Sequence, residues 1–130
     1  MSDSIKRLPD SELEVMQAVW ACNPPVSRAD IKEQLAASYP IAQTTLLTLL
    51  TRLTDKGFLK AELDGQRKLF FPLVSQQEYL AAQSNRFVKK LCGGNLSTFA
   101  AALCDSGLTK EEIAELRSLL ERDALGARKY

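Results

Sequence analysis

Threonine and arginine recur between residues 42 and 56 at spacings that place them on one side of a helix. At about 100° per residue, the same segment forms an apolar stripe of four leucines: Leu46, Leu49, Leu50 and Leu53. The opposite face carries hydroxyl and charged residues: Thr44, Thr48, Thr51, Arg52 and Asp55, with Thr45 on its flank. Because threonine is a mediocre helix former, so many of them in one short helix indicate a role other than helicity.

Short hydroxyl side chains and arginine suit a helix that lies in the major groove of DNA. A threonine hydroxyl bonds to a base edge, its methyl group contacts thymine, and arginine binds guanine or phosphate. At the start of the preceding helix, side chains and free N–H groups can bind phosphate, and a basic pair lies just past a hairpin tip. The candidate DNA-binding residues are Ser27, Arg28, Gln43, Thr44, Thr45, Thr48, Arg52, Arg67 and Lys68.

Each of these features alone has a simpler explanation. A threonine-rich helix face is more often solvated surface, and a basic pair on a hairpin usually serves solubility. Their combination within one helix–helix–helix–hairpin order favours DNA binding. Residues 1–75 contain equal numbers of basic and acidic side chains, so we expect nonspecific DNA binding to be weak.

The elements that must position these residues follow from local signals. The predicted elements are a helix from Asp10 to the stop at Asn23–Pro25, a helix from Ser27 to Tyr39, a helix from about Ala42 to Lys56, and strands Phe58–Leu63 and Lys68–Phe71. Asp30 lies at capping-box distance from Ser27, Gly57 suits a left-handed C-cap, and Asp64–Gly65 predicts a hairpin turn. This is the order of a winged helix-turn-helix domain: mainly α, with a small β-hairpin wing.

Three further helices are predicted after residue 75. Ser75 with Glu78 and Thr109 with Glu112 form capping boxes, and Gly93–Gly94 separates the first helix from the second. Leu80, Phe87 and Leu91 mark the inner face of the first of these helices. We expect a winged-helix domain at 1–75 and a three-helix dimerisation domain at 76–130, because so short a helical segment buries little surface alone. The candidate dimerisation residues are Phe87, Leu91, Leu96, Phe99, Leu103, Ile113, Leu116 and Leu120.

Composition narrows the function classes. The 130 residues are 45% hydrophobic and 25% charged, with a formal net charge of +1. There is no histidine, so mechanisms that activate a nucleophile with histidine are excluded. The three cysteines, Cys22, Cys92 and Cys104, form no C-x-C or C-x-x-C pair. We therefore expect no enzyme, no cofactor, no metal site and no membrane partner, and the polar start of the chain favours a cytoplasmic protein.

Four segments resemble the penicillinase-repressor family (BlaI/MecI/CopY) and extend over nearly the whole chain. They are Leu13–Met16 leading to Val19–Trp20, Thr44–Leu53 with Lys56–Gly57, Phe70–Ser75, and Leu108–Arg117. The second segment contains the pattern T-x-x-T-L-L-x-R-L-x-x-K-G, which is quite specific, and the others support it in the right order.

The resemblance implies an N-terminal winged helix, a C-terminal helical dimerisation domain, and repression at inverted repeats of the TACA/TGTA type. It places Thr44, Thr45 and Thr48 on the base-contacting surface and Arg52 beside the DNA backbone. Copper-responsive members end in a C-x-C…C-x-C cluster that this chain lacks. Members cleaved by a membrane sensor protease have an Asn–Phe bond where this chain has Ala101–Ala102. Neither form of induction is therefore implied.

The sequence thus predicts a homodimeric repressor whose partner is double-stranded operator DNA, with an upstream sensor left unidentified. Two alternatives stay open. One is a DNA-binding regulator switched by a thiol or soft metal at Cys92 and Cys104. The other is a winged-helix protein-interaction module that makes no DNA contact.

Overall fold

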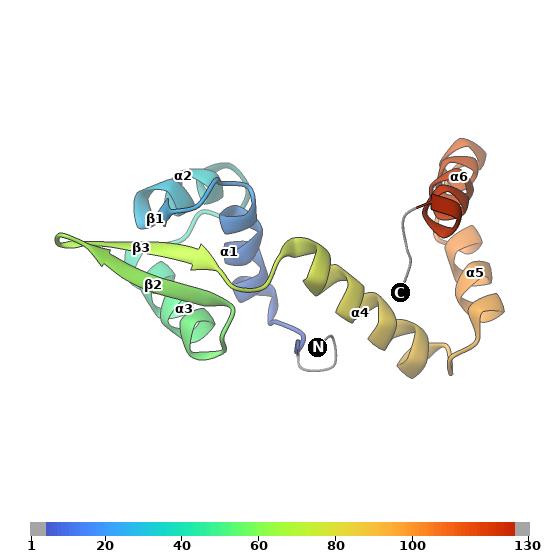
Figure 1. The fold of residues 1–130 in the computed structure, drawn as a ribbon, viewed down its shortest axis with the longest axis horizontal. Helices are drawn as coiled ribbons and strands as arrows, with labels where there is room; N and C mark the ends of the chain where they lie inside the picture. Colours follow the sequence, from blue (N-terminus) through green and yellow to red (C-terminus); the bar gives the residue numbers. More distant parts are fainter. Residues whose placement is uncertain (1–4, 127–130) are drawn as a thin grey trace. The chain divides into compact units, whose positions relative to one another are not determined.

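The computed structural model describes the backbone of residues 5–126 and the side chains of residues 5–122. Its elements follow the chain as α1 (Asp10–Trp20), β1 (Val26–Ser27), α2 (Arg28–Ser38), α3 (Gln43–Asp55), β2 (Leu59–Asp64), β3 (Arg67–Pro72), α4 (Gln76–Leu91), α5 (Leu96–Asp105) and α6 (Lys110–Gly126) (Figure 1). The predicted fold class, three helices and a hairpin wing followed by three further helices, is confirmed.

The apolar stripes of α1, α2 and α3 meet in one core. Met16 of α1 and Ile31 of α2 are fully buried, and the predicted leucine stripe of α3 is confirmed, with each of its four side chains at most 3% exposed. Recurrence every three or four residues turns one side of each helix inward. The opposite side of α3, which carries the threonines, is consequently left to solvent.

β2 and β3 form the predicted hairpin, in which Asp64 pairs with Arg67. Gly65 lies in the turn at φ +68°, a conformation that side chains with a Cβ rarely adopt. β1 adds a third strand on the far side of β3, where Val26 pairs with Phe70. This strand was not predicted, because two residues are too few to show an alternating pattern.

The beginning of α4 is fixed to the elements that precede it. Its predicted capping box is present: the Glu78 N–H donates to Ser75 Oγ at 3.0 Å, and the Ser75 N–H donates to the Glu78 carboxylate at 2.8 Å. Tyr79 is 3% exposed, and its hydroxyl accepts a hydrogen bond from the Leu8 N–H at 2.8 Å. The rings of Trp20 and Phe58 each lie 5.9 Å from the Tyr79 ring.

The chain divides into two compact units, Met1–Ser84 and Asn85–Tyr130, with the boundary inside α4. The predicted division into residues 1–75 and 76–130 concerns which segment folds alone and stays a prediction. Because Tyr79 and Ala82 are both buried, the first two turns of α4 belong with the core of the first unit.

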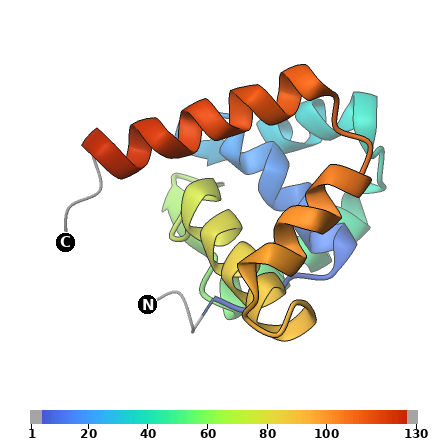
Figure 2. The same cartoon turned by 90° about the vertical axis from the view of Figure 1, so that its right-hand side faces the viewer.

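The second unit has little interior of its own. None of its described side chains is fully buried, although Phe87 and Phe99 meet edge to face with ring centroids 5.7 Å apart. The predicted capping box of α6 is present, with hydrogen bonds of 2.9 and 3.0 Å between Thr109 and Glu112. Figure 2 shows α5 and α6 as two helices that diverge from a short turn. Gly107 lies in the turn between them at φ +99°.

The prediction that Leu80, Phe87 and Leu91 form an inner face of α4 is wrong for a single chain. Leu80 is 52% and Leu91 is 71% exposed, and Phe87 is also exposed. The prediction of this face rested only on the spacing of apolar residues along the helix. The face that packs is determined instead by Tyr79, whose hydrogen bond to a distant backbone group leaves no trace in the local pattern.

Candidate nucleic-acid interface

The end of α3 is capped by its own backbone. The Phe58 N–H donates to the Leu53 carbonyl at 3.0 Å, and the Gly57 N–H donates to the Thr54 carbonyl at 3.1 Å. Gly57 adopts φ +82°, as the predicted left-handed C-cap requires. These two bonds form a Schellman motif, which stops α3 sharply and sends the chain into β2.

An ion pair between a buried carboxylate and a partly exposed ammonium group holds the same end of α3 against α1. The ammonium group of Lys56, directly after α3, donates to the carboxylate of Glu12. Glu12 is only 2% exposed. Removing Lys56 would leave the buried Glu12 carboxylate without compensation, so this contact constrains how α3 lies on α1.

The exposed face of α3 carries the three predicted base-contacting threonines, and with them Arg52, which is predicted to lie beside the DNA backbone. Thr44, Thr45, Thr48 and Arg52 are all exposed, and they project from the side opposite the buried leucines. The face therefore presents small hydroxyl and methyl groups with one cation near its C-terminal end. Such a surface permits close approach to base edges.

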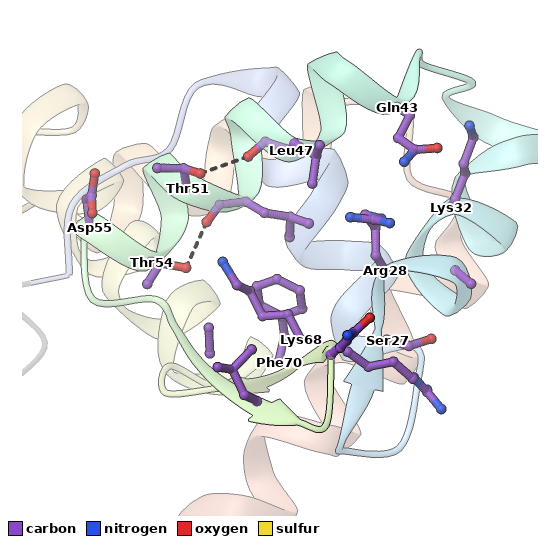
Figure 3. A pocket seen from close by; sticks show the side chains of 16 residues that line it. Ser27, Arg28, Lys32, Gln43, Leu47, Thr51, Thr54, Asp55, Lys68 and Phe70 are labelled. Atoms are coloured by element: carbon purple, nitrogen blue, oxygen red, sulfur yellow. Dashed lines mark hydrogen bonds between the residues drawn. The ribbon is translucent and has the colours of Figure 1, made fainter.

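Three threonines of α3 donate their hydroxyl hydrogens to the helix itself. Thr48 donates to the Thr44 carbonyl at 3.1 Å, Thr51 to the Leu47 carbonyl at 3.0 Å, and Thr54 to the Leu50 carbonyl at 2.8 Å (Figure 3 draws the latter two). With the hydrogen engaged, the exposed Thr48 and Thr51 offer outward only oxygen lone pairs and a methyl group, whereas Thr54 is half-buried. Those groups complement the amino groups of adenine and cytosine and the methyl group of thymine.

A groove of about 690 Å³ separates α3 from the N-terminal end of α2 and from the hairpin. Figure 3 shows the side chains that line this groove. Arg28 and Lys32 come from α2, Gln43 and Leu47 from α3, and Phe70 from the hairpin. Four cationic residues line the groove: Arg28, Lys32, Arg67 and Lys68. Among its described lining residues the acidic member is Asp55 alone, so the groove is strongly positive although the chain is nearly neutral.

The nine predicted DNA-binding residues fall into two groups in the structure. Those that line the groove are Ser27, Arg28, Gln43, Arg67 and Lys68. The other four, the three predicted threonines and Arg52, lie on the neighbouring exposed face of α3. Ser27 is 9% exposed, and both its hydroxyl and its N–H are engaged in the predicted capping box with Asp30, at 3.1 and 3.2 Å. Ser27 thus fixes the start of α2, and Arg28 is the first exposed residue beyond it.

Sequence reasoning missed several residues of this surface. Lys32 lines the groove one helical turn after Arg28, and the i, i+4 spacing of these two cations was a usable signal. Thr51 and Gln66 also line the groove. Glu12 gave no usable signal, because an acid in the first turn of a helix is normally explained by the helix dipole.

The eight predicted dimerisation residues all belong to the second unit and are partly or largely exposed. Leu91 and Leu96 are each 71% exposed, Leu120 is 62% and Phe87 is 42% exposed. The remaining four are half-buried: Phe99, Leu103, Ile113 and Leu116. A single chain therefore leaves a large apolar surface on this unit in contact with water.

The three cysteines differ in their surroundings. Cys22 is half-buried, and burial, with the nearby Asp30 and Glu33 carboxylates, raises the pKa of its thiol. Cys92 is half-buried and Cys104 is exposed. In the part of the chain that is described, no group of three His, Cys, Asp or Glu side chains could hold a metal ion. Likewise, no helix within that part is long and apolar enough to cross a membrane.

Comparisons with known proteins find relatives along almost the whole chain. The family model described as Penicillinase repressor matches residues 8–122. The penicillinase repressor of Bacillus licheniformis is 27% identical over 118 residues, 90% of this chain and 91% of that protein. The methicillin resistance regulatory protein MecI of Mammaliicoccus sciuri is 26% identical over 123 residues, 94% and 99% of the two chains. A solution structure of monomeric B. licheniformis BlaI in complex with the blaP half-operator is 27% identical, with a TM-score of 0.48, covering 58% of this chain and 90% of that one.

Proposed function

This chain belongs to the penicillinase repressor family, a family of DNA-binding repressors, and from that premise we propose that it represses transcription as a homodimer bound to an inverted-repeat operator. The family is one of transcriptional repressors, so the prediction that the chain is not an enzyme is confirmed. Membership also weighs against the alternative of an interaction module without DNA contact.

The observation that carries the proposal is the exposed threonine face of α3 beside a groove lined by four cations. In the proposed complex α3 lies in the major groove, with Thr44, Thr45 and Thr48 toward the base edges. Arg28 and Lys32 of α2 and the two hairpin cations line one groove beside α3, where they meet phosphates of the DNA strand that borders it. Phosphate contacts set the position of the domain, and base contacts select the sequence.

Dimerisation accounts for the apolar surface of the second unit. An exposed surface of this kind needs a partner, and a second copy of the same chain supplies one with complementary residues by symmetry. Pairing also compensates for the weak charge of the DNA-binding unit. Once one half-site is bound, the linked domain meets the second at high effective concentration, which can raise avidity by about 10²–10⁴.

Selection from a random duplex library with the full chain tests sequence-specific binding. We expect enrichment of an inverted repeat. On the enriched duplex, Arg52→Ala and Arg67→Ala should each weaken binding and lower the slope of log affinity against log salt by about one unit. Arg7→Ala is the matched control, because Arg7 is exposed in the same unit but does not line the groove. Failure of any sequence to be enriched would contradict the proposal.

Sedimentation equilibrium of the full chain tests the homodimer. The wild-type chain should sediment as a dimer, and Leu91→Ser or Leu96→Ser should shift it toward monomer because each removes exposed apolar surface from the second unit. Leu73→Ser is the control, since Leu73 is 55% exposed but belongs to the first unit. A monomeric wild-type chain, or equal dissociation by all three variants, would show that this surface does not join two copies.

A further inference from the structure

Two leucines on the positive groove remain unexplained by contacts to bases or phosphates. Leu63 of β2 is 73% exposed and Leu47 of α3 is 40% exposed, and both line the groove. Scattered exposed leucines are ordinary on protein surfaces. These two, however, continue an apolar floor formed by Leu50 and Phe70, which are 2% and 4% exposed. The groove therefore has an apolar floor between basic side chains.

The size of a helix determines what lies over this floor when α3 occupies the major groove. An α-helix with its side chains is about 10–12 Å across, and the major groove is about 12 Å wide. α3 therefore fills the major groove of the DNA. The protein elements beside α3 then meet the sugar–phosphate strand that borders the major groove. The hairpin is such an element, because the positive groove lies between it and α3. One DNA strand must then pass over the floor.

The chemistry of a DNA strand matches this arrangement. A strand alternates anionic phosphates with deoxyribose rings, whose carbon faces are apolar. Phosphates suit Arg28 and Lys32 on α2 and Arg67 and Lys68 on the hairpin, and the sugar faces suit a leucine floor. We infer that Leu63, together with Leu47, packs against the deoxyribose of one strand and anchors the domain on DNA without regard to sequence. This inference rests on the proposed function.

An apolar contact of this kind has a signature that a phosphate contact lacks. It releases no counterions, so its loss lowers affinity at every salt concentration by the same factor and leaves the salt slope unchanged. It also applies equally to any sequence, because every nucleotide carries the same sugar. Substitutions at base-contacting residues should instead lower the preference for one sequence over another.

The test compares full-chain variants on the duplex enriched by selection and on a scrambled duplex of equal length. Leu63→Ser should weaken binding about tenfold on both duplexes, the low end of what burial of a leucine is worth. Its salt slope should equal that of the wild type, whereas Arg67→Ala lowers the slope by about one. Leu63→Lys should recover affinity and steepen the slope, because it adds a cation beside the strand. Leu73→Ser, at a leucine that is 55% exposed and lies outside the groove, should change nothing.

The outcomes separate this inference from the proposed function. If the wild type binds its selected duplex and Leu63→Ser binds equally well, the floor does not contact DNA and the inference is overturned. The inference is also overturned if Leu63→Ser lowers the salt slope together with the affinity. It is overturned as well if Leu63→Ser shifts the monomer–dimer equilibrium in the absence of DNA, because a second copy of the chain would then cover the floor. If the wild type prefers no duplex, the proposed function fails first. Thermal unfolding of Leu63→Ser should match the wild type, because the side chain is 73% exposed.

Discussion

Thr48 donates its hydroxyl hydrogen to the Thr44 carbonyl, so only its oxygen lone pairs and methyl group face outward. Thr48→Val removes the lone pairs and keeps the methyl group, and Thr48→Ser does the reverse. We expect at least one of these variants to lose about 1–3 kcal/mol of binding free energy on the selected duplex and much less on a scrambled one. Fluorescence anisotropy titrations measure both.

The same pair of variants identifies the group that Thr48 contacts. A loss for Thr48→Ser that disappears when thymine is replaced by deoxyuridine assigns a methyl–methyl contact. A loss for Thr48→Val assigns an amino donor of adenine or cytosine. Equal losses on selected and scrambled duplexes would contradict a role in base selection.

The ion pair between Glu12 and Lys56 joins residues that are far apart in the sequence, and we expect it to stabilise the fold. Lys56→Met leaves the Glu12 carboxylate buried and unpaired, so we expect a loss of about 3 kcal/mol in the free energy of unfolding. Glu12→Gln should cost less, about 1–3 kcal/mol, because the amide remains a hydrogen-bond acceptor. The double variant should be more stable than Lys56→Met alone. Chemical denaturation monitored by circular dichroism measures all three, and additive losses would contradict the account.

Cys22 should react with iodoacetamide more slowly than Cys104 near pH 8. Burial and two neighbouring carboxylates raise the pKa of its thiol, which lowers the fraction of reactive thiolate, whereas Cys104 is exposed. Mass spectrometry of timed samples gives the order. A Cys22 that reacts as fast as Cys104 would show a more open environment.

We also expect the triple Cys→Ser chain to bind operator DNA. A loss of DNA binding with intact folding would favour the thiol-responsive alternative.

Helix α4 links the two units, and the position at which it is cut should decide the stability of the first. A fragment of residues 1–84 keeps Tyr79, whose hydroxyl and ring contact Leu8, Trp20 and Phe58, and a fragment of residues 1–75 loses it. We expect the longer fragment to be more stable by about 3–5 kcal/mol, as for loss of a buried aromatic side chain. Both should be monomers. In the full chain, Tyr79→Phe should cost about 1–3 kcal/mol, because it leaves the Leu8 N–H unpaired. Equal melting temperatures for the two fragments would place the domain boundary at Ser75.

Elements with strong local signals could be predicted from the sequence, and contacts between distant residues could not. The leucine stripe of α3, the left-handed Gly57 and the capping box at Ser27 each follow from neighbouring residues. β1 was missed because its pairing with β3 is set by tertiary packing. The true packing face of α4 and the Glu12–Lys56 pair were missed for the same reason. For the candidate interface, residue types and helical spacing indicated α3, but the groove and its leucine floor appear only when the hairpin is folded beside it.

At the scale of the whole molecule, a chain whose basic and acidic side chains nearly balance must concentrate positive charge locally in order to bind DNA. The formal net charge is +1, yet four cations and one acid line the groove beside α3. Such a chain gains little from nonspecific attraction to DNA. Specific contacts and the linkage of two copies must then supply the affinity. Affinity should therefore depend strongly on the spacing of the two half-sites.

The central claim, two α3 helices joined by dimerisation and bound on one side of a duplex, is tested most directly by half-site phasing. The full chain is titrated against its selected inverted repeat, against the same repeat lengthened at its centre by about 5 base pairs, and against one lengthened by about 10 base pairs, a full helical turn. The account predicts two chains per duplex and a loss of affinity of about 10²-fold or more for the half-turn insertion, with recovery for the full turn as far as the dimer can span it. Equal affinity for all three duplexes, or for a duplex with a single half-site, would contradict it.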